Sequence, residues 1–470
     1  MTSLKPRLLQ SFIPREISLY VVCLVMVLTI SITFFGVTNY WIKITCVLLL
    51  PIVFTYPTGM FVARFFRIAA FDELGVLSRI VSFSLIGAVT NGILFSLIGL
   101  LHLFTVPVVI GYFLALVTIY IALNNNNKNY PRPFNINKKI FLASVLPVLV
   151  VSFFSLAIAL WFQPLYSFPN LAGWDTYTHL LTVRTTIFKH GISQLNLEYL
   201  PTLHYFYAAD SILTNTDPYL LYWGSIYFLF PLAGASFYFL GSRLGRNRLV
   251  GICTAVFGVT IGSTNEALGL IFPFPSTYGL IITILANAVL LSTFNKKFLM
   301  VYVFSIIMVY QFALAANLII LVGVWFYKSR RSAYIKALAI TIAIFVVGLY
   351  FGGSFYASVG GTTLSTEQVW KIIGSSYVGW HGLILIVLGG FFIYYHKIII
   401  DRRIALILMS SGVTFLIIIS GWYAITYRLE EFIRPYTAFV IGYGIGSLTI
   451  ELTKIVVDQL SIRRRNYKKF

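Results

Sequence analysis

Ionisable residues are scarce in this chain. Only 10% of its 470 residues are charged, and 14 Asp and Glu stand against 34 Lys and Arg. Soluble proteins carry about a quarter of their residues as charges, so this composition excludes an ordinary water-soluble protein. A net charge of +20 would indicate a nucleic-acid partner in a soluble chain, but the placement of the basic residues described below argues for membrane lipids and against nucleic acid.

Cysteine is also rare. The three cysteines, Cys23, Cys46 and Cys253, each lie within an apolar run, where a thiol behaves as a small hydrophobic group. This pattern excludes a disulfide framework and a Cys-x-x-Cys metal site.

Apolar residues are abundant at 59%, and runs of the length that crosses a bilayer recur along the chain. The sequence therefore predicts an all-α polytopic membrane protein with about 14 transmembrane helices. No small-residue cleavage site follows the first run, so we interpret it as a retained helix and not a signal peptide. The predicted spans lie near residues 17–37, 41–60, 79–101, 104–123, 140–163, 218–240, 248–263, 277–294, 298–311, 313–327, 336–353, 380–395, 404–422 and 435–453.

Two of these spans come from one apolar run, residues 298–327. As a single helix it would be about 45 Å long, well beyond the ~30 Å hydrocarbon core. Two short helices that turn near Gln311 would also place the basic clusters on either side of the run on one face of the membrane. We therefore predict two helices.

The basic residues set the orientation. With both termini in the cytoplasm, most Lys and Arg fall in cytoplasmic segments such as "GSRLGRNR", "KSRRSAYIK" and "RRRNYKK". We interpret these clusters as topology signals and contacts with anionic lipids, without a chemical role. The predicted location is the cell membrane, as a multi-pass protein.

The chain divides into two parts. Residues 1–123 form a four-helix membrane module, and residues 124–139, with repeated Asn and two prolines, form a cytoplasmic linker. Residues 140–470 form the main membrane domain. Its long external loops, 164–217 and 354–379, contain many aromatic residues, and ordered loops of this length usually carry function.

The first long loop holds the strongest cluster of ionisable residues, in "GWDTYTHLLTVRTTIFKHG". Helical spacing predicts an amphipathic helix over Trp174–Lys189 in the outer membrane interface, with its apolar face formed by Tyr177, Leu180, Leu181, Ile187 and Phe188. Asp175 and His179 share another face with Thr182 and Thr186. Asp175 fits a helix cap and a catalytic carboxylate equally well.

The same loop continues with "EYLPTLHYFYAADSILTNTDPYLL". Pro201 and His204 mark a turn into a second amphipathic segment, and His204 is a candidate site residue. Asp217, which Pro218 follows, has the pattern of an N-cap before a proline at the first helical position. We therefore expect Asp217 to be structural.

Two further external segments contain candidates. Glu266 lies between apolar helix ends, where a carboxylate is costly unless it is paired or binds a cation; a helix start capped by Thr264 explains it equally well. Pro435 predicts the first turn of the last span, with Arg434 at the positive end of that helix. Glu430 and Glu431 could balance this arginine, but Arg428 is available to pair with one of them, which favours a lipid phosphate near Arg434.

This layout resembles the GT-C glycosyltransferase superfamily, which includes oligosaccharyltransferases, protein O-mannosyltransferases and aminoarabinose transferases. The resemblance covers about Lys139 to the C-terminus and depends on the Asp-x-x-x-His motif of "GWDTYTHL", the "YLPTLH" turn, the "SRLGRNR" loop and an arginine in the last external loop. It implies a GT-C-like core in which Asp175 is a catalytic base or a metal-binding carboxylate. It further implies that Glu266 takes the place of a second acidic motif and that Glu367 of "TLSTEQ" is a loop glutamate. Arg434 would lie beside the donor phosphate. No Asp-x-Asp motif is present, and a "WWDYG"-type acceptor motif is absent, which argues against asparagine glycosylation.

The resemblance implies an enzyme that transfers a sugar from a polyprenyl-phosphate donor to a glycan, lipid or protein acceptor on the extracytoplasmic side. Asp175 would take the acceptor proton. His179, or a Mg or Mn ion held by Asp175, His179 and Glu266, would position that carboxylate. Arg434, with Arg428 or His204, would stabilise the leaving phosphate.

Two other classes of protein fit the sequence. One is a transporter or a flippase for lipid-linked oligosaccharides, which would place polar residues such as Gln311 and Asn317 near mid-bilayer. The other is a non-catalytic membrane assembly subunit, which the missing Asp-x-Asp motif allows.

Overall fold

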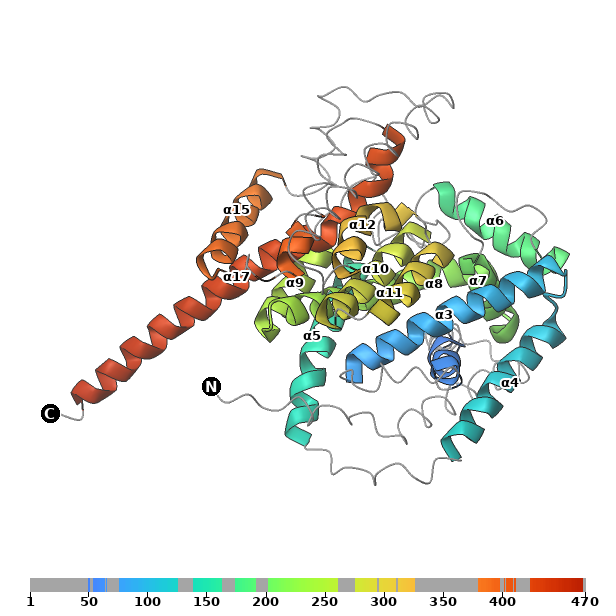
Figure 1. Ribbon diagram of the computed structural model, residues 1–470, viewed down its shortest axis with the longest axis horizontal. Coiled ribbons are helices and arrows are strands. Elements are labelled where there is room, and N and C mark those ends of the chain that lie inside the picture. The colour runs from blue at the N-terminus through green and yellow to red at the C-terminus, as the bar shows by residue number, and fades with distance from the viewer. Residues whose placement is uncertain are drawn as a thin grey trace.

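A computed structural model describes the chain in helical segments, and the described part contains no strand (Figure 1). The described residues are 50, 54–63, 65, 76–125, 138–162, 174–191, 202–260, 275–293, 296–309, 312–325, 379–397, 401, 403–408, 410 and 423–467. The labelled helices are α3 (Val76–Leu100), α4 (Val106–Asn125), α5 (Lys138–Phe162), α6 (Trp174–Lys189), α7 (Thr202–Thr214), α8 (Pro218–Leu244), α9 (Arg248–Thr260), α10 (Pro275–Thr293), α11 (Lys296–Val309), α12 (Phe312–Trp325), α15 (Gly379–Tyr395) and α17 (Tyr423–Tyr467).

Three of the described helices are long and apolar enough to cross a membrane: Ile80–Leu100, Pro218–Leu244 and Pro435–Leu460. Shorter apolar helices lie at most of the other predicted spans. The described part is thus compatible with a helical membrane protein. The predicted spans 17–37 and 336–353 lie outside the described residues, as do most of 41–60 and 404–422.

The run 298–327 forms two helices, as predicted. α11 ends at Val309 and α12 begins at Phe312. The two helices pack against each other.

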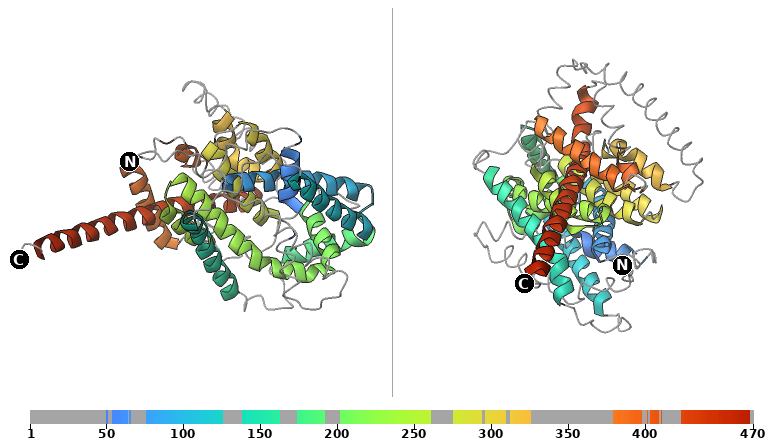
Figure 2. Two further views of the ribbon diagram at one scale, coloured as in Figure 1. Left: turned by 90° about the horizontal axis from the view of Figure 1, so that it is seen from below. Right: turned by 90° about the vertical axis from the view of Figure 1, so that its left-hand side faces the viewer.

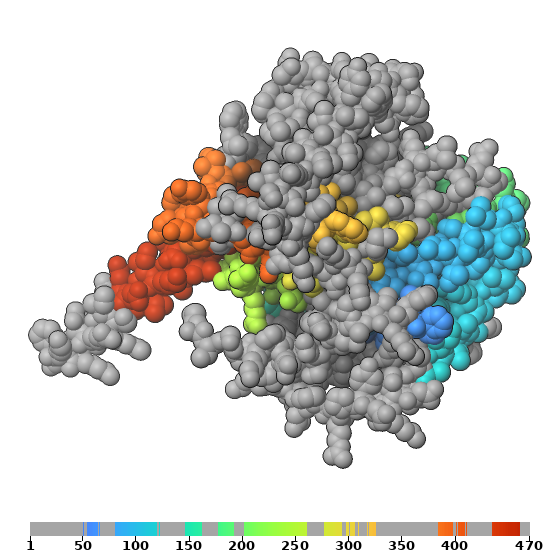
Figure 3. Space-filling view, viewed as in Figure 1, coloured from blue at the N-terminus to red at the C-terminus, as the bar shows by residue number. Residues whose placement is uncertain are grey.

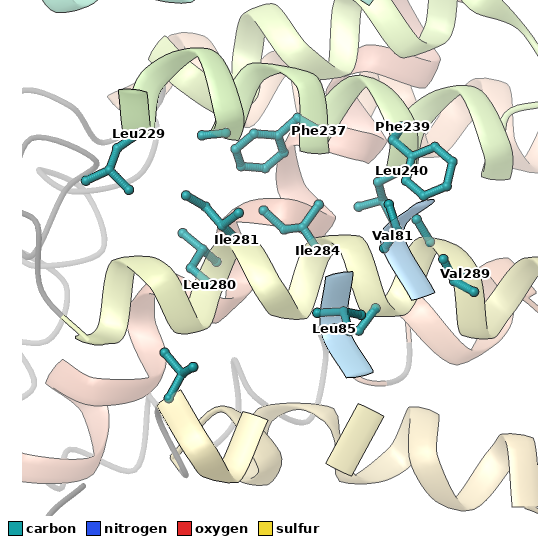
Figure 4. Close-up of a cluster of buried hydrophobic side chains, with 14 of the residues drawn as sticks. Val81, Leu85, Leu229, Phe237, Phe239, Leu240, Leu280, Ile281, Ile284 and Val289 are labelled. Carbon is teal, nitrogen blue, oxygen red and sulfur yellow. The ribbon is translucent and has the colours of Figure 1, made fainter. Parts of the chain in front are cut away.

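One part of the hydrophobic core is formed by side chains of α3, α8 and α10 (Figure 4), and the same core extends through the other described helices. Side chains from each helix fill this space, because each presents an apolar face that would otherwise remain unpaired. The labelled residues are Val81 and Leu85 of α3, Leu229, Phe237, Phe239 and Leu240 of α8, and Leu280, Ile281, Ile284 and Val289 of α10. The predicted N-terminal module therefore shares a core with the main membrane domain. Most of the predicted linker, residues 126–137, lies outside the described residues.

The last helix, α17, begins earlier than predicted. Pro435 does not start it but lies inside it, since the helix begins at Tyr423. Arg434 is therefore not at a helix N-terminus, and the dipole argument for a phosphate beside it was wrong. Pro147 in α5 and Pro231 in α8 are also internal, which is typical of membrane helices whose neighbours satisfy the freed backbone groups.

The C-terminal half of α17 projects away from the body of the protein (Figures 1 and 2). Its exposed apolar side chains are Leu452, Ile455, Val456, Val457 and Leu460, and the exposed polar residues Thr453, Lys454, Asp458 and Gln459 lie between them. A second exposed apolar surface covers α3 and α4, which form one continuous face at the right of Figure 3. Apolar surface of this extent is typical of contact with lipid.

Candidate functional site

The helix predicted over Trp174–Lys189 is α6, with the same first and last residues. It packs against α7 and α8. Its apolar residues do not form the single face that the sequence predicts. Leu180 and Val183 are buried, whereas Tyr177, Leu181 and Phe188 are exposed, Phe188 to 84%. One side of α6 thus packs on the protein, and the other presents an apolar stripe that suits a membrane interface.

The predicted N-cap at Asp217 is confirmed. Its carboxylate accepts a hydrogen bond of 2.8 Å from the Tyr219 N–H, and Pro218 follows at the first helical position of α8. Arg184 of α6 donates to both carboxylate oxygens, at 2.9 and 3.0 Å. Burial alone would raise the pKa of Asp217, but the bonds from Arg184 and the Tyr219 N–H lower it below its ordinary value. Asp217 therefore ties α6 to α8.

His179 and His204 meet in the interior. The two side chains are 7% and 2% exposed, and His179 Nδ1 lies 3.0 Å from His204 Nε2. Burial and the neighbouring His179 lower the pKa of His204 to about 3, so this imidazole is neutral at pH 7. The face of α6 that carries His179 thus points inward at α7.

Because His204 is neutral when folded, we expect the protein to lose stability in mild acid. In the unfolded protein this imidazole has a pKa of about 6.5. Between about pH 6.5 and pH 3 it is therefore protonated in the unfolded state but neutral in the folded state. Its contribution is complete above pH 6.5 and falls by about 1.4 kcal/mol per pH unit below it. The melting temperature of the wild type in detergent, relative to that of His204→Gln, should therefore fall as the pH is lowered from 7 to 4. A pH-independent difference would contradict this assignment.

Asp210 is not among the predicted site residues, but it lies in the interior. Its side chain is 4% exposed, and its Oδ1 atom has no hydrogen-bond partner among the described residues. Burial raises its pKa well above the ordinary value. One helical turn earlier, Tyr207 shares a 2.7 Å hydrogen bond with the hydroxyl of Tyr278 and stacks on Tyr222 at 4.3 Å. The acid that ends the aromatic segment "HYFYAAD" was the available signal.

The other predicted site residues are described less fully. Asp175 lies in the first turn of α6, four residues before His179. Arg428 and Arg434 are the sixth and the twelfth residues of α17. Glu266 and Glu367 lie outside the described residues, as does the predicted loop 354–379 except for its last residue, Gly379.

The metal site also stays a prediction. Within the described residues, no three His, Cys, Asp or Glu side chains gather to hold a metal ion. The 3.0 Å contact between His179 and His204 uses one ring nitrogen of each residue. Glu266 lies outside the described part of the chain, and Asp175 is described only through its backbone.

The chain was compared with known proteins at the levels of sequence and fold. No protein-family model, curated protein or solved structure matches it.

Proposed function

We propose that this chain is a polytopic membrane glycosyltransferase of the GT-C kind. It transfers a sugar from a polyprenyl-phosphate donor to an acceptor on the extracytoplasmic side of the cell membrane. The observation that carries the proposal is the helix α6, which begins at Trp174, sets Asp175 one turn before the buried His179–His204 pair, and exposes an apolar stripe.

The helix geometry supports pairing of these groups. Because α6 is helical from Trp174, Asp175 and His179 occupy positions i and i+4 on one face. His204 holds His179 through the 3.0 Å contact, and it is neutral. His204 is therefore suited to orienting His179 and not to stabilising a phosphate.

Two contacts between loops agree with the proposed topology. The α3–α4 turn and the end of α6, both predicted external, meet where Phe104 N–H donates to the His190 carbonyl at 3.0 Å. The loops after α8 and α15, both predicted cytoplasmic, meet where Arg246 contacts Asp401 at 3.2 Å. Segments assigned to one side of the membrane thus lie together in each case.

In the proposed reaction, Asp175 accepts the proton of the acceptor hydroxyl as its oxygen attacks the anomeric carbon of the sugar. The bond from that carbon to the donor phosphate breaks, and the polyprenyl phosphate leaves with the electron pair. Arg434 and Arg428 stabilise its developing charge. Where a divalent cation takes part, Asp175, His179 and Glu266 would hold it.

The polar residues inside the helical core favour an enzyme over a carrier. Asn287 donates to Asn317 at 2.9 Å, Tyr302 donates to Asn287 at 2.9 Å, and Tyr436 donates to Asn317. These bonds tie α10, α11, α12 and α17 together. Polar groups satisfied in this way stabilise one packing arrangement, whereas a carrier needs polar groups that bind cargo.

The proposed function is tested by reconstituting the purified protein into liposomes. Mass spectrometry of the lipids that copurify should find a polyprenyl-phosphate sugar, and that donor, added to the liposomes, should transfer its sugar to an acceptor hydroxyl. Transport of the intact donor across the bilayer without cleavage would overturn the proposal in favour of a flippase.

Replacing Arg434 is expected to weaken donor binding. Arg434→Ala removes a charge-assisted contact worth about 1.5–3 kcal/mol, so the Kd should rise about 10- to 100-fold. Donor binding is measured by isothermal titration calorimetry in nanodiscs. Arg246→Ala serves as the control, because Arg246 is 69% exposed and contacts Asp401 on the opposite proposed side. Equal affinity of Arg434→Ala and Arg246→Ala would remove the phosphate role.

A further inference from the structure

The turn between α3 and α4 is fixed to the end of α6. Phe104 N–H donates to the His190 carbonyl at 3.0 Å, and His102 Nδ1 donates to the Lys189 carbonyl at 3.3 Å. His102 and His190 both have positive φ angles, 55° and 59°, which few non-glycine residues adopt. The N-terminal module thus binds the backbone that ends α6.

Two glycines make this contact close. A Cβ atom on Gly191 would overlap the carbonyl oxygen of Gly99, and a Cβ atom on Gly99 would overlap the ring of Tyr205. No other residue type fits without displacement of the neighbouring groups. The last turn of α3 therefore touches α7 and the residue that lies just after α6.

Aromatic side chains extend this contact along α7. Phe104 lies 5.2 Å from Tyr205, and Phe95 lies 5.3 Å from Phe206, measured between ring centroids. Tyr205 is only 1% exposed. Such pairs add stability beyond the area they bury. Tyr205 and Phe206 directly follow His204. The N-terminal module therefore packs against α7 beside the imidazole pair.

We infer that the N-terminal module is a positioning element, which uses Gly99, Phe95 and Phe104 to hold α7 so that His204 stays against His179. The role of this module within the protein is thus to position α7. The inference depends on the α6–α7 contacts and not on the sugar-transfer reaction. The two can therefore fail separately.

Gly99→Ala tests the inference by hydrogen–deuterium exchange and mass spectrometry of the full chain in detergent. We expect amide exchange in Thr202–Thr214 to become at least tenfold faster, with little change in α8 and α9. Gly111→Ala is the matched control, because Gly111 also lies in a helix of the N-terminal module and a Cβ there meets no atom within 4 Å.

A second-site variant separates positioning from general damage. Removing the Tyr205 ring removes the clash, so Gly99→Ala added to Tyr205→Ala should not accelerate exchange beyond Tyr205→Ala alone. Unchanged exchange in α7 of Gly99→Ala would overturn the inference, and so would equal acceleration in α8 and α9.

Discussion

Asp175→Asn is expected to lower the rate of sugar transfer by about 10²- to 10⁴-fold, the usual contribution of a general base. The amide keeps the size and the capping ability of the carboxylate but cannot take the acceptor proton. Donor affinity should change little, because the proposed phosphate contacts come from Arg428 and Arg434. The measurement is transfer in liposomes under saturating donor, with the amount of folded protein determined by size-exclusion chromatography.

Asp217→Asn is the control for this experiment. It changes another acid of the same loop, but one whose role as the N-cap of α8 and the partner of Arg184 is structural. Asparagine also caps helices well, and an exposed ion pair contributes about 0–1 kcal/mol. Transfer by Asp217→Asn should stay close to wild type. If Asp175→Asn retained the wild-type rate, Asp175 would not be the base.

The positions of most described helices followed from the sequence, because apolar runs of fixed length report burial or lipid contact directly. The division of residues 298–327 is an example. A length argument and two basic clusters predicted the turn near Gln311, and α11 and α12 end and begin on either side of it. The N-cap at Asp217 was predictable for a similar reason, since capping depends on adjacent residues alone.

Pro435 shows where such local reasoning fails. Proline is common at the first turn of a helix, yet α17 continues through it. Whether a helix starts at a proline or continues through it depends on the helices packed around it. The residues near Pro435 in the sequence do not reveal which helices these are. The prediction of a single apolar face on α6 was wrong for the same reason. Packing on α7 and α8 divides the apolar residues of this helix into a buried set and an exposed set.

Part of the site depends on contacts between distant residues and was not predictable. The sequence selected His179 and His204 separately, but only the packing of α6 on α7 brings their rings together. The burial of Asp210 likewise depends on its surroundings, which include Tyr278 of α10.

Asp210→Asn is expected to stabilise the protein at neutral pH. Burial raises the pKa of Asp210 above its unfolded value of about 3.9. The folded state therefore keeps a proton that the unfolded state releases, and stability falls as the pH rises above about 4. Asparagine has no such proton to lose. Each unit of pKa separation is worth about 1.4 kcal/mol, so the melting temperature in detergent should rise at pH 7.

The pH dependence distinguishes this effect from a simple packing change. The gain of Asp210→Asn over wild type should shrink as the pH is lowered and approach zero about one unit below the unfolded pKa, where both states hold the proton. Asp217→Asn should differ in sign at pH 7, because the lowered pKa of Asp217 stabilises the folded state above its unfolded pKa and that contribution is lost as the pH falls. A wild type as stable as Asp210→Asn at pH 7 would contradict the prediction. A stabilised variant that transferred sugar poorly would instead indicate that this buried acid is retained for activity, because residues that cost stability concentrate at functional sites.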